Sequence, residues 1–177
     1  MEGKKVRIRA LRKKDLGEIM KWINDYEVTR TLASFLYPTS QEEEIKWLEN
    51  TLQPNDRNKA FVIETKKGEY LGHIGLHRID WKNRNAEVGI VIGKKKHWNK
   101  GYGTDAMMTI LDFAFNRMNL HKIYLRVFDF NKGAIRSYEK CGFKKEGLLR
   151  EIFYNEGKYH NLVMMGILKK EYKVSAL

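Results

Sequence analysis

The stretch AEVGIVIGKKKHWNKGYGTDA, from Ala86 to Ala106, carries the strongest information about the fold. An apolar strand runs into a basic loop, and the loop leads to a Gly-x-Gly that opens a helix. The first N–H groups of a helix have no partner within the helix and form the positive end of its dipole. This arrangement therefore predicts a binding site for an anionic group, most simply a phosphate.

Side chains of the strand alternate between its two faces. One face is wholly apolar and predicts core: Ala86, Val88, Ile90 and Ile92. The other face carries Glu87, Gly89, Val91 and Gly93. Glycine weakens a strand, and glycines beside a carboxylate indicate that a ligand or another backbone approaches closely. We expect this second face to form the floor of a cleft.

The glycine loop has to be distinguished from similar motifs. Gly101 to Ala106 also fits the G-x-G-x-x-A fingerprint of nicotinamide-dinucleotide folds, but there the first glycine follows the strand almost directly. Here the residues from Lys94 to Lys100 intervene. No Gly-Lys-Ser/Thr occurs, which excludes a nucleoside-triphosphate loop. On this motif alone, a helix-entry turn with a purely structural role stays open.

Length and composition favour one domain spanning residues 1–177, because 177 residues bury one core well and are few for two. No segment approaches the roughly 18 apolar residues of a membrane span, and the first residues lack the apolar region of a secretion signal. We therefore expect a cytoplasmic protein. The single cysteine, Cys141, fits a reducing compartment. It is expected to be a small packed residue at a helix end, with a reactive thiol as the alternative.

The net charge of +12 is compatible with nucleic acid, an acidic protein surface or an anionic cofactor. Most lysines are scattered along the chain, which is typical of solvated faces. The cluster Lys94–Lys96 with Lys100 is different, because it falls in the predicted anion loop. We therefore expect an anionic cofactor and no specific nucleic acid.

Alternation, helical spacing and turn residues predict an α/β (α+β) domain with a mixed sheet. A capping box from Ser40 to Glu43 opens one helix, and Gly142 ends another. Turns at 66–69 and 155–157 each close a hairpin. Strands are expected at 4–11, 61–63, 70–79, 86–93, 121–128, 143–154 and 159–168, and helices at 15–22, 41–52, 107–118 and 132–141.

Two motifs resemble those of a known family. Asn131-x-x-Ala134-x-x-Ser137-Tyr138-x-x-x-Gly142-Phe143 resembles the N-x-x-A-x-x-x-Y-x-x-x-G-F signature of the GNAT superfamily of acyl-CoA N-acyltransferases. Trp98-x-x-Gly101-x-Gly103 resembles its pyrophosphate loop, although Trp98 stands where the family commonly has Gln or Arg. That change weakens a side-chain contact and leaves the backbone cradle intact. The order of elements resembles the family over nearly the whole chain, and 121–172 looks most like its ribosomal-protein and spermidine N-acetyltransferase branches.

The resemblance implies a mixed, mostly antiparallel central sheet flanked by helices, with acetyl-CoA as cosubstrate. The pyrophosphate would bind to the loop from residue 98 to residue 104, that is Trp98, Asn99, Lys100, Gly101, Tyr102, Gly103 and Thr104. Asn131 would hydrogen-bond the pantetheine arm, with Ala134 beside it. Backbone groups of Val91, Ile92 and Gly93 would pair with the pantetheine amides in the manner of an added strand.

Acetyl transfer from a thioester to an amine requires a neutral amine, a held carbonyl and a proton for the departing thiolate. Glu87 faces the predicted cleft and can accept the amine proton, directly or through water. An ordinary carboxylate is a weak base, so burial or a water relay must assist it; the alternative is that Glu87 simply pairs with a Lys or Arg. By resemblance, Tyr138 protonates the thiolate, which a phenol suits in pKa. Its alternative role is to pack its ring on the core.

No metal is expected. His73 and His77 share a strand face but lie roughly 13 Å apart along it, too far to ligate one ion. Both are expected at the surface or at the edge of the cleft. No other group of His, Cys and carboxylate residues has the spacing of a ligand set.

The amine acceptor is the least determined part of the prediction. In the spermidine branch, acidic residues cluster before the second helix, whereas residues 33–39 here contain none. A chain at +12 also repels a polyamine unless local acids compensate. The favoured acceptor is therefore a protein N-terminal α-amine, with a small amine (polyamine, amino acid or aminoglycoside) as the alternative. A basic RNA- or ribosome-binding module with a vestigial coenzyme site is the reading from a different class, and a homodimer is compatible with either.

Overall fold

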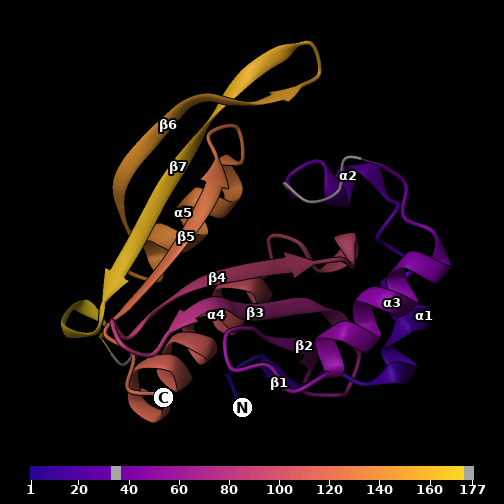
Figure 1. Ribbon diagram of the computed structural model, residues 1–177, viewed down its shortest axis with the longest axis horizontal. Coiled ribbons are helices and arrows are strands. Elements are labelled where there is room, and N and C mark those ends of the chain that lie inside the picture. The colour runs from indigo at the N-terminus through magenta and orange to yellow at the C-terminus, as the bar shows by residue number, and fades with distance from the viewer. Residues whose placement is uncertain (33–36, 174–177) are drawn as a thin grey trace.

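The computed structural model describes residues 1–32 and 37–173 (Figure 1). Seven strands form one sheet in the order β1-β2-β3-β4-β5-β7-β6, and all neighbours are antiparallel except β4 and β5. This is the mixed, mostly antiparallel sheet that was predicted, and it uses strands from both ends of the described chain. The strands are β1 (Val6–Ala10), β2 (Lys59–Thr65), β3 (Tyr70–Asp80), β4 (Asn85–Ile92), β5 (Lys122–Phe128), β6 (Lys144–Asn155) and β7 (Lys158–Leu168).

The parallel junction between β4 and β5 is short. The two strands pair only from Asn85–Lys122 to Glu87–Tyr124. Beyond Glu87 they diverge, so the sheet opens like a V between the half containing β1–β4 and the half containing β5–β7 (Figure 1). One edge of β4 therefore faces the opening instead of a neighbouring strand.

The helices divide between the two halves. Helix α4 (Tyr102–Asp112) contacts β1, β3 and β4, and α5 (Lys132–Lys140) contacts α4. Helix α3 (Gln41–Leu52) begins at the predicted capping box: the Ser40 hydroxyl accepts a hydrogen bond from the Glu43 N–H, and the Glu43 carboxylate accepts one from the Ser40 N–H. Its apolar side joins Trp22 and residues of β2 and β3 in a core cluster of its own.

Two predicted helices differ from the structure. The expected helix at 15–22 is only a 3-10 turn, η1 (Lys13–Asp15), followed by α1 (Leu16–Ile19), and the short α2 (Tyr26–Thr29) was not predicted. The buried Asp15 carboxylate accepts hydrogen bonds from the Arg9 guanidinium and the Arg12 N–H, and these local bonds compete with a longer helix. The helix after the glycine loop changes at Phe113 into a π-helical segment, η3 (Phe113–Arg117).

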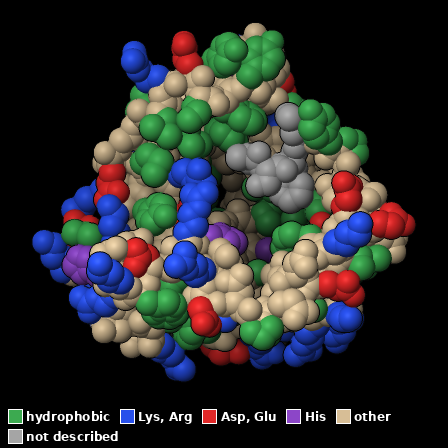
Figure 2. Space-filling view, viewed as in Figure 1, with side chains coloured by type: hydrophobic (Ala, Val, Ile, Leu, Met, Phe, Trp, Pro, Cys, Tyr) green, Lys and Arg blue, Asp and Glu red, His purple; other side chains and the backbone are tan. Residues whose placement is uncertain are grey.

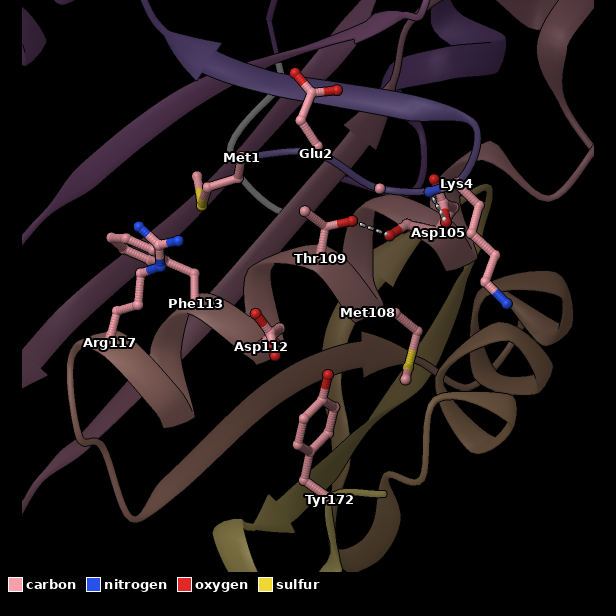
Figure 3. A pocket seen from close by; sticks show the side chains of 11 residues that line it. Met1, Glu2, Lys4, Asp105, Met108, Thr109, Asp112, Phe113, Arg117 and Tyr172 are labelled. Atoms are coloured by element: carbon pink, nitrogen blue, oxygen red, sulfur yellow. Dashed lines mark hydrogen bonds between the residues drawn. The ribbon is translucent and has the colours of Figure 1, made fainter. Parts of the chain in front are cut away.

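Asp105 fixes the start of α4 to the beginning of the chain (Figure 3). Its carboxylate accepts hydrogen bonds from the N–H groups of Lys4, Lys5 and Val6 at 3.0, 2.7 and 3.0 Å. A carboxylate in the first turn of a helix also complements the helix dipole. Lys5 in turn donates to the carbonyl of Lys100 at 2.9 Å. The glycine loop is thus held from the β1 side.

Candidate active site

A cleft of about 1660 Å³ occupies the opening of the sheet. The hollow is visible at the centre of Figure 2, with histidine side chains at its base. It is lined by residues of β3, β4, β5, α3, α5 and the glycine loop. Twelve of the predicted site residues line it: Glu87, Val91, Ile92, Trp98, Asn99, Gly101, Tyr102, Gly103, Thr104, Asn131, Ala134 and Tyr138.

Gly93 and Lys100 are predicted site residues that fall outside the cleft lining. A Cβ on Gly93 would lie 2.4 Å from the Trp22 ring, so this glycine makes room for a core side chain and not for a ligand. Lys100 is exposed, and its carbonyl accepts the Lys5 hydrogen bond. The expectation for Gly93 is corrected, whereas a contact of Lys100 with the coenzyme stays a prediction.

The glycine loop has the geometry of an anion cradle. Gly101 is the N-cap of α4 and has φ of +82°, a conformation that favours glycine. The N–H groups of Tyr102, Gly103 and Thr104 follow in the first turn of the helix, where no intrahelical carbonyl is available to them. Backbone N–H groups and the helix dipole thus converge on the cleft, as the sequence predicted.

The lysine cluster of the loop is engaged by acids. Lys94 and Lys96 lie 3.5 and 2.7 Å from the Glu69 carboxylate, and Lys95 lies 2.8 Å from Asp25. Hydrogen bonds from Lys96 and His97 lower the pKa of Glu69 to about 2, which keeps it ionised. Lys94, Lys95 and Lys96 therefore hold the loop to the rest of the protein.

Trp98 contributes to the loop through an internal hydrogen bond. Its indole N–H donates to the Ile92 carbonyl at 2.7 Å, which ties the loop to the end of β4. Gly93 donates its N–H to Leu71 of β3 at 2.8 Å. Because backbone groups of successive residues point to opposite edges of a strand, those of Val91 also face β3, whereas those of Ile90 and Ile92 face the opening.

The expected pantetheine contacts are corrected accordingly. Of the predicted residues 91–93, only Ile92 presents its N–H to the opening, and its carbonyl is taken by Trp98. Ile90 presents both of its backbone groups there and was missed. The two-residue period of a strand predicts which backbone groups share an edge. It does not predict which edge of β4 faces the cleft, because that depends on the neighbours of β4 in the sheet.

Tyr138 is half-buried on α5 and lines the cleft. Its ring packs on the core and lies 6.0 Å from the Phe143 ring. Burial raises the pKa of Tyr138 to about 12, so the phenol keeps its proton at neutral pH. The two predicted roles are therefore compatible, since the ring packs while the side chain borders the cleft.

Asn131 has a structural role that was not predicted. Its side-chain oxygen accepts a hydrogen bond from the Ala134 N–H at 3.1 Å and caps α5. Only the amide NH₂ of Asn131 then remains to bind pantetheine. Beside it, the hydroxyls of Thr104 and Ser137 lie 2.8 Å apart and join α4 to α5.

Glu87 makes two ion pairs on the cleft floor. One oxygen accepts from Arg126 at 2.7 Å, and the other accepts from Arg78 at 2.9 Å. The alternative of an ion-paired Glu87 is thus what the structure shows, and a role as base stays a prediction. Neither arginine was singled out in the sequence, because their contact depends on the pairing of β3, β4 and β5.

His73 lines the cleft, the second of the two places that were predicted for it. Its ring stacks on Trp47 with centroids 5.8 Å apart, and its Nε2 is 3.0 Å from the Tyr70 hydroxyl. Burial lowers the pKa of His73 to about 4. His77 also lines the cleft. Within residues 1–32 and 37–173, no group of His, Cys, Asp or Glu has the arrangement of a metal site.

Glu44 is a further cleft residue that sequence reasoning missed. It is only 4% exposed and lines the cleft from α3, and its carboxylate has no hydrogen bond or ion pair with any described residue. Burial raises the pKa of Glu44 to about 7. In the sequence it is one of three consecutive glutamates at a helix start, and nothing distinguishes the one that points inward.

The split sheet, the glycine loop at a helix N-terminus and the tyrosine beside the cleft define an acetyl-CoA-dependent N-acetyltransferase. The chain belongs to the GNAT acetyltransferase domain family, whose model matches residues 5–144. Within the described part of the chain, no helix has the length and apolar character needed to cross a membrane.

Individual relatives are similar along nearly their whole length. Spermidine N(1)-acetyltransferase of Vibrio cholerae is 33% identical over 167 residues, 93% of this chain and 94% of the relative. The protein of the same name from Escherichia coli K12 is 32% identical over 167 residues, 94% and 88% of the two chains. The crystal structure of spermidine N-acetyltransferase from Vibrio cholerae in complex with CoA and spermine matches with a TM-score of 0.87 at 32% identity, covering 94% of this chain and 97% of that one.

Proposed function

We propose that this enzyme acetylates a primary amine of a small cationic molecule of the polyamine type. The sequence favoured a protein N-terminal α-amine, but the relatives named spermidine N-acetyltransferases support the small-molecule alternative better. The observation that carries the proposal is Glu44, a buried carboxylate that lines the cleft without a described partner.

The surroundings of Glu44 suit an ammonium group. An unpaired carboxylate is costly to bury, and an ammonium ligand supplies the missing charge and hydrogen bond. Trp47 lies one helical turn further along α3, and it lines the cleft together with Trp22 and His73. Aromatic faces attract cations, so the wall beside the carboxylate is also favourable for an alkylammonium chain.

Glu44 supplies a local negative charge that can offset the repulsion of a polyamine by a chain of net charge +12. A polyamine needs local acids, and the other three cleft glutamates are engaged elsewhere. Glu27 pairs with Lys95, the Glu43 carboxylate accepts a hydrogen bond from the Ser40 N–H, and Glu87 pairs with two arginines. Among these four, only the carboxylate of Glu44 has no hydrogen bond or ion pair in the described structure. The stretch without carboxylates, 33–39, includes residues 33–36, which lie outside the described part.

In the proposed reaction, backbone N–H groups of the glycine loop bind the pyrophosphate, and the edge of β4 at Ile90 and Ile92 pairs with pantetheine. Tyr138 donates its proton to the coenzyme A thiolate as the carbon–sulfur bond breaks. These roles rest on the positions of the residues around one cleft. A cytoplasmic location and a homodimer stay predictions. Light scattering, which gives the molar mass in solution, tests whether the protein is a dimer.

The acceptor is tested by measuring coenzyme A release with polyamines, amino acids, aminoglycosides and N-terminal peptides, with products identified by mass spectrometry. We expect the highest kcat/KM for a polyamine. A higher value for N-terminal peptides would restore the first prediction. RNA retention at several salt concentrations, without turnover of any amine, would favour the binding-module alternative.

The Glu44→Gln variant tests whether the unpaired carboxylate in the cleft recognises the acceptor. We expect kcat/KM for a polyamine to fall by about 10-fold or more, since a charge-assisted contact contributes roughly 1.5–3 kcal/mol. A monoamine of similar length that lacks the second ammonium should be affected much less. Glu42→Gln, an exposed position on the same helix, is the matched control. Equal losses for both amines would contradict a role of Glu44 in recognising the acceptor charge.

A further inference from the structure

The floor of the cleft consists of three cross-strand pairs between β3 and β4. His73 lies opposite Val91, Gly75 opposite Gly89, and His77 opposite Glu87. The central pair has no side chains, so the floor is a trough with a histidine at each end. The space above the Gly75–Gly89 pair, between the two histidines, can hold a small amine.

The imidazole of His77 leans over this trough. A Cβ placed on Gly75 would lie 2.9 Å from Nε2 of His77, and a Cβ on Gly89 would lie 3.4 Å from the same atom. Nε2 therefore lies above the Gly75–Gly89 pair, displaced along the strands from Glu87 toward Val91. This position is near the part of β4 that we assign to the pantetheine arm.

The charged groups around His77 come from three strands. Glu87 of β4 lies opposite, Arg78 follows in β3, and Arg126 of β5 reaches the same Glu87 carboxylate. Asn58, just before β2, and Ala60 of β2 also line the cleft, and neither titrates. Burial is the main cause that lowers the pKa of His77, and Glu87 offsets part of the effect.

Two other cleft side chains that could serve as a base, Glu87 and His73, are occupied, and Glu44 is the residue that we assign to the second charge of the acceptor. Both oxygens of Glu87 accept hydrogen bonds from arginines, so protonating it breaks an ion pair. Nε2 of His73 is bonded to the Tyr70 hydroxyl. Neither ring nitrogen of His77 has a hydrogen-bond partner among the described residues. A neutral imidazole always has one nitrogen with a free lone pair.

We propose that His77 is the general base of the reaction, accepting a proton from the acceptor amine above the Gly75–Gly89 trough. The amine nitrogen forms a bond to the acetyl carbon, the carbon–sulfur bond breaks, and the thiolate takes its proton from Tyr138. His77 holds the proton lost by the amine, and exchange with solvent returns it to Tyr138. Glu87 is then a positioning residue, whose charge favours the imidazolium that forms.

The inference rests on the proposed acetyltransferase reaction and is tested on the full chain with the best amine of the panel. We expect His77→Gln to lower kcat/KM by about 10²–10⁴-fold. It should also abolish the acidic limb of the pH–rate profile, that is, the fall of kcat/KM at low pH caused by protonation of a group on the enzyme. His73→Gln is the matched control and should keep this limb. Acetyl-CoA affinity, measured by calorimetry, should be unchanged in both variants.

An NMR titration of the histidines gives a readout independent of turnover. The His77 resonance should titrate below the ordinary histidine pKa in the wild type, and lower still in Glu87→Gln, because the carboxylate that favours the imidazolium is gone. An acidic limb that survives in His77→Gln, or a His77 resonance that ignores Glu87→Gln, would overturn the assignment. A wild type that acetylates no amine would overturn the proposed function as well, so the two failures are distinguishable.

Discussion

At the scale of single residues, buried polar side chains differ in whether they have a partner. The Asp15 carboxylate, outside the cleft, is bound by Arg9, and His73 in the cleft wall is hydrogen-bonded to Tyr70. The side chains of Glu44 and Tyr138 line the cleft without a hydrogen bond to a described residue. A protein retains unsatisfied polar groups mainly where a ligand completes them, so these two positions are where substrate chemistry is expected.

Tyr138→Phe removes the hydroxyl and leaves the packing of the ring on Phe143. If Tyr138 protonates the thiolate, kcat should fall by roughly 10²–10⁴-fold, with little change in acetyl-CoA affinity. The measurement is single-turnover acetyl transfer together with calorimetric binding. An unaltered rate, under conditions in which chemistry limits turnover, would leave Tyr138 with a packing role only.

Glu44 also predicts a dependence of stability on pH. Its pKa is raised from 4.5 to about 7 in the folded protein, so the folded state binds more protons than the unfolded state between these values. Stability contributed at this site is therefore full below about pH 4.5 and is lost as pH rises through 7. Glu44→Gln should be more stable than the wild type at pH 8, by on the order of 1 kcal/mol because solvent in the cleft screens the charge, but not at pH 4.5. Urea unfolding at both pH values checks this; a difference independent of pH would contradict it.

At the scale of elements, the strands and hairpins were predictable because each has a local signal. The capping box at Ser40 and the turns at 66–69 and 155–157 fix their own ends. The short helices α1 and α2 were not predictable, because their lengths depend on contacts such as Arg9 with Asp15, which join residues of different elements. The same holds for the site. Its motif residues could be named, but the partners of Glu87 depend on which strands lie side by side.

The glycine loop gives a prediction for one element. Gly103 has no positive φ, and a Cβ there would lie 3.8 Å from Ile92, an ordinary contact. Gly103→Val should therefore preserve the fold, while its larger side chain projects where the backbone approaches the pyrophosphate. Calorimetry should show loss of acetyl-CoA binding. Gly17→Val, an exposed helical glycine with open space around it, is the control for the cost of valine in a helix. Unchanged affinity in Gly103→Val would contradict the loop assignment.

At the scale of the whole molecule, the two halves of the sheet share one apolar core but pair as strands over a short length only. Three β4–β5 residue pairs join them, with the Glu87–Arg126 ion pair and the Thr104–Ser137 hydrogen bond near the opening. The proposed acetyl-CoA site uses both halves, since the glycine loop and β4 belong to one and Tyr138 and Asn131 to the other. A ligand that contacts both halves resists their separation as well as their unfolding.

Acetyl-CoA should therefore stabilise the entire fold in a concentration-dependent way. A ligand that binds only the folded state adds about 2.7 kcal/mol at 100 times its dissociation constant, which for a chain of this size raises Tm by roughly 5–10 °C. Calorimetric scans with increasing acetyl-CoA measure the shift. Gly103→Val should show none at the same concentrations, because the loss of the loop site removes the linkage and not the stability of the apoprotein. Hydrogen exchange should at the same time slow at the β4–β5 junction, where the halves meet. A shift in Tm that is equal in both proteins would mean that the ligand binds away from the loop.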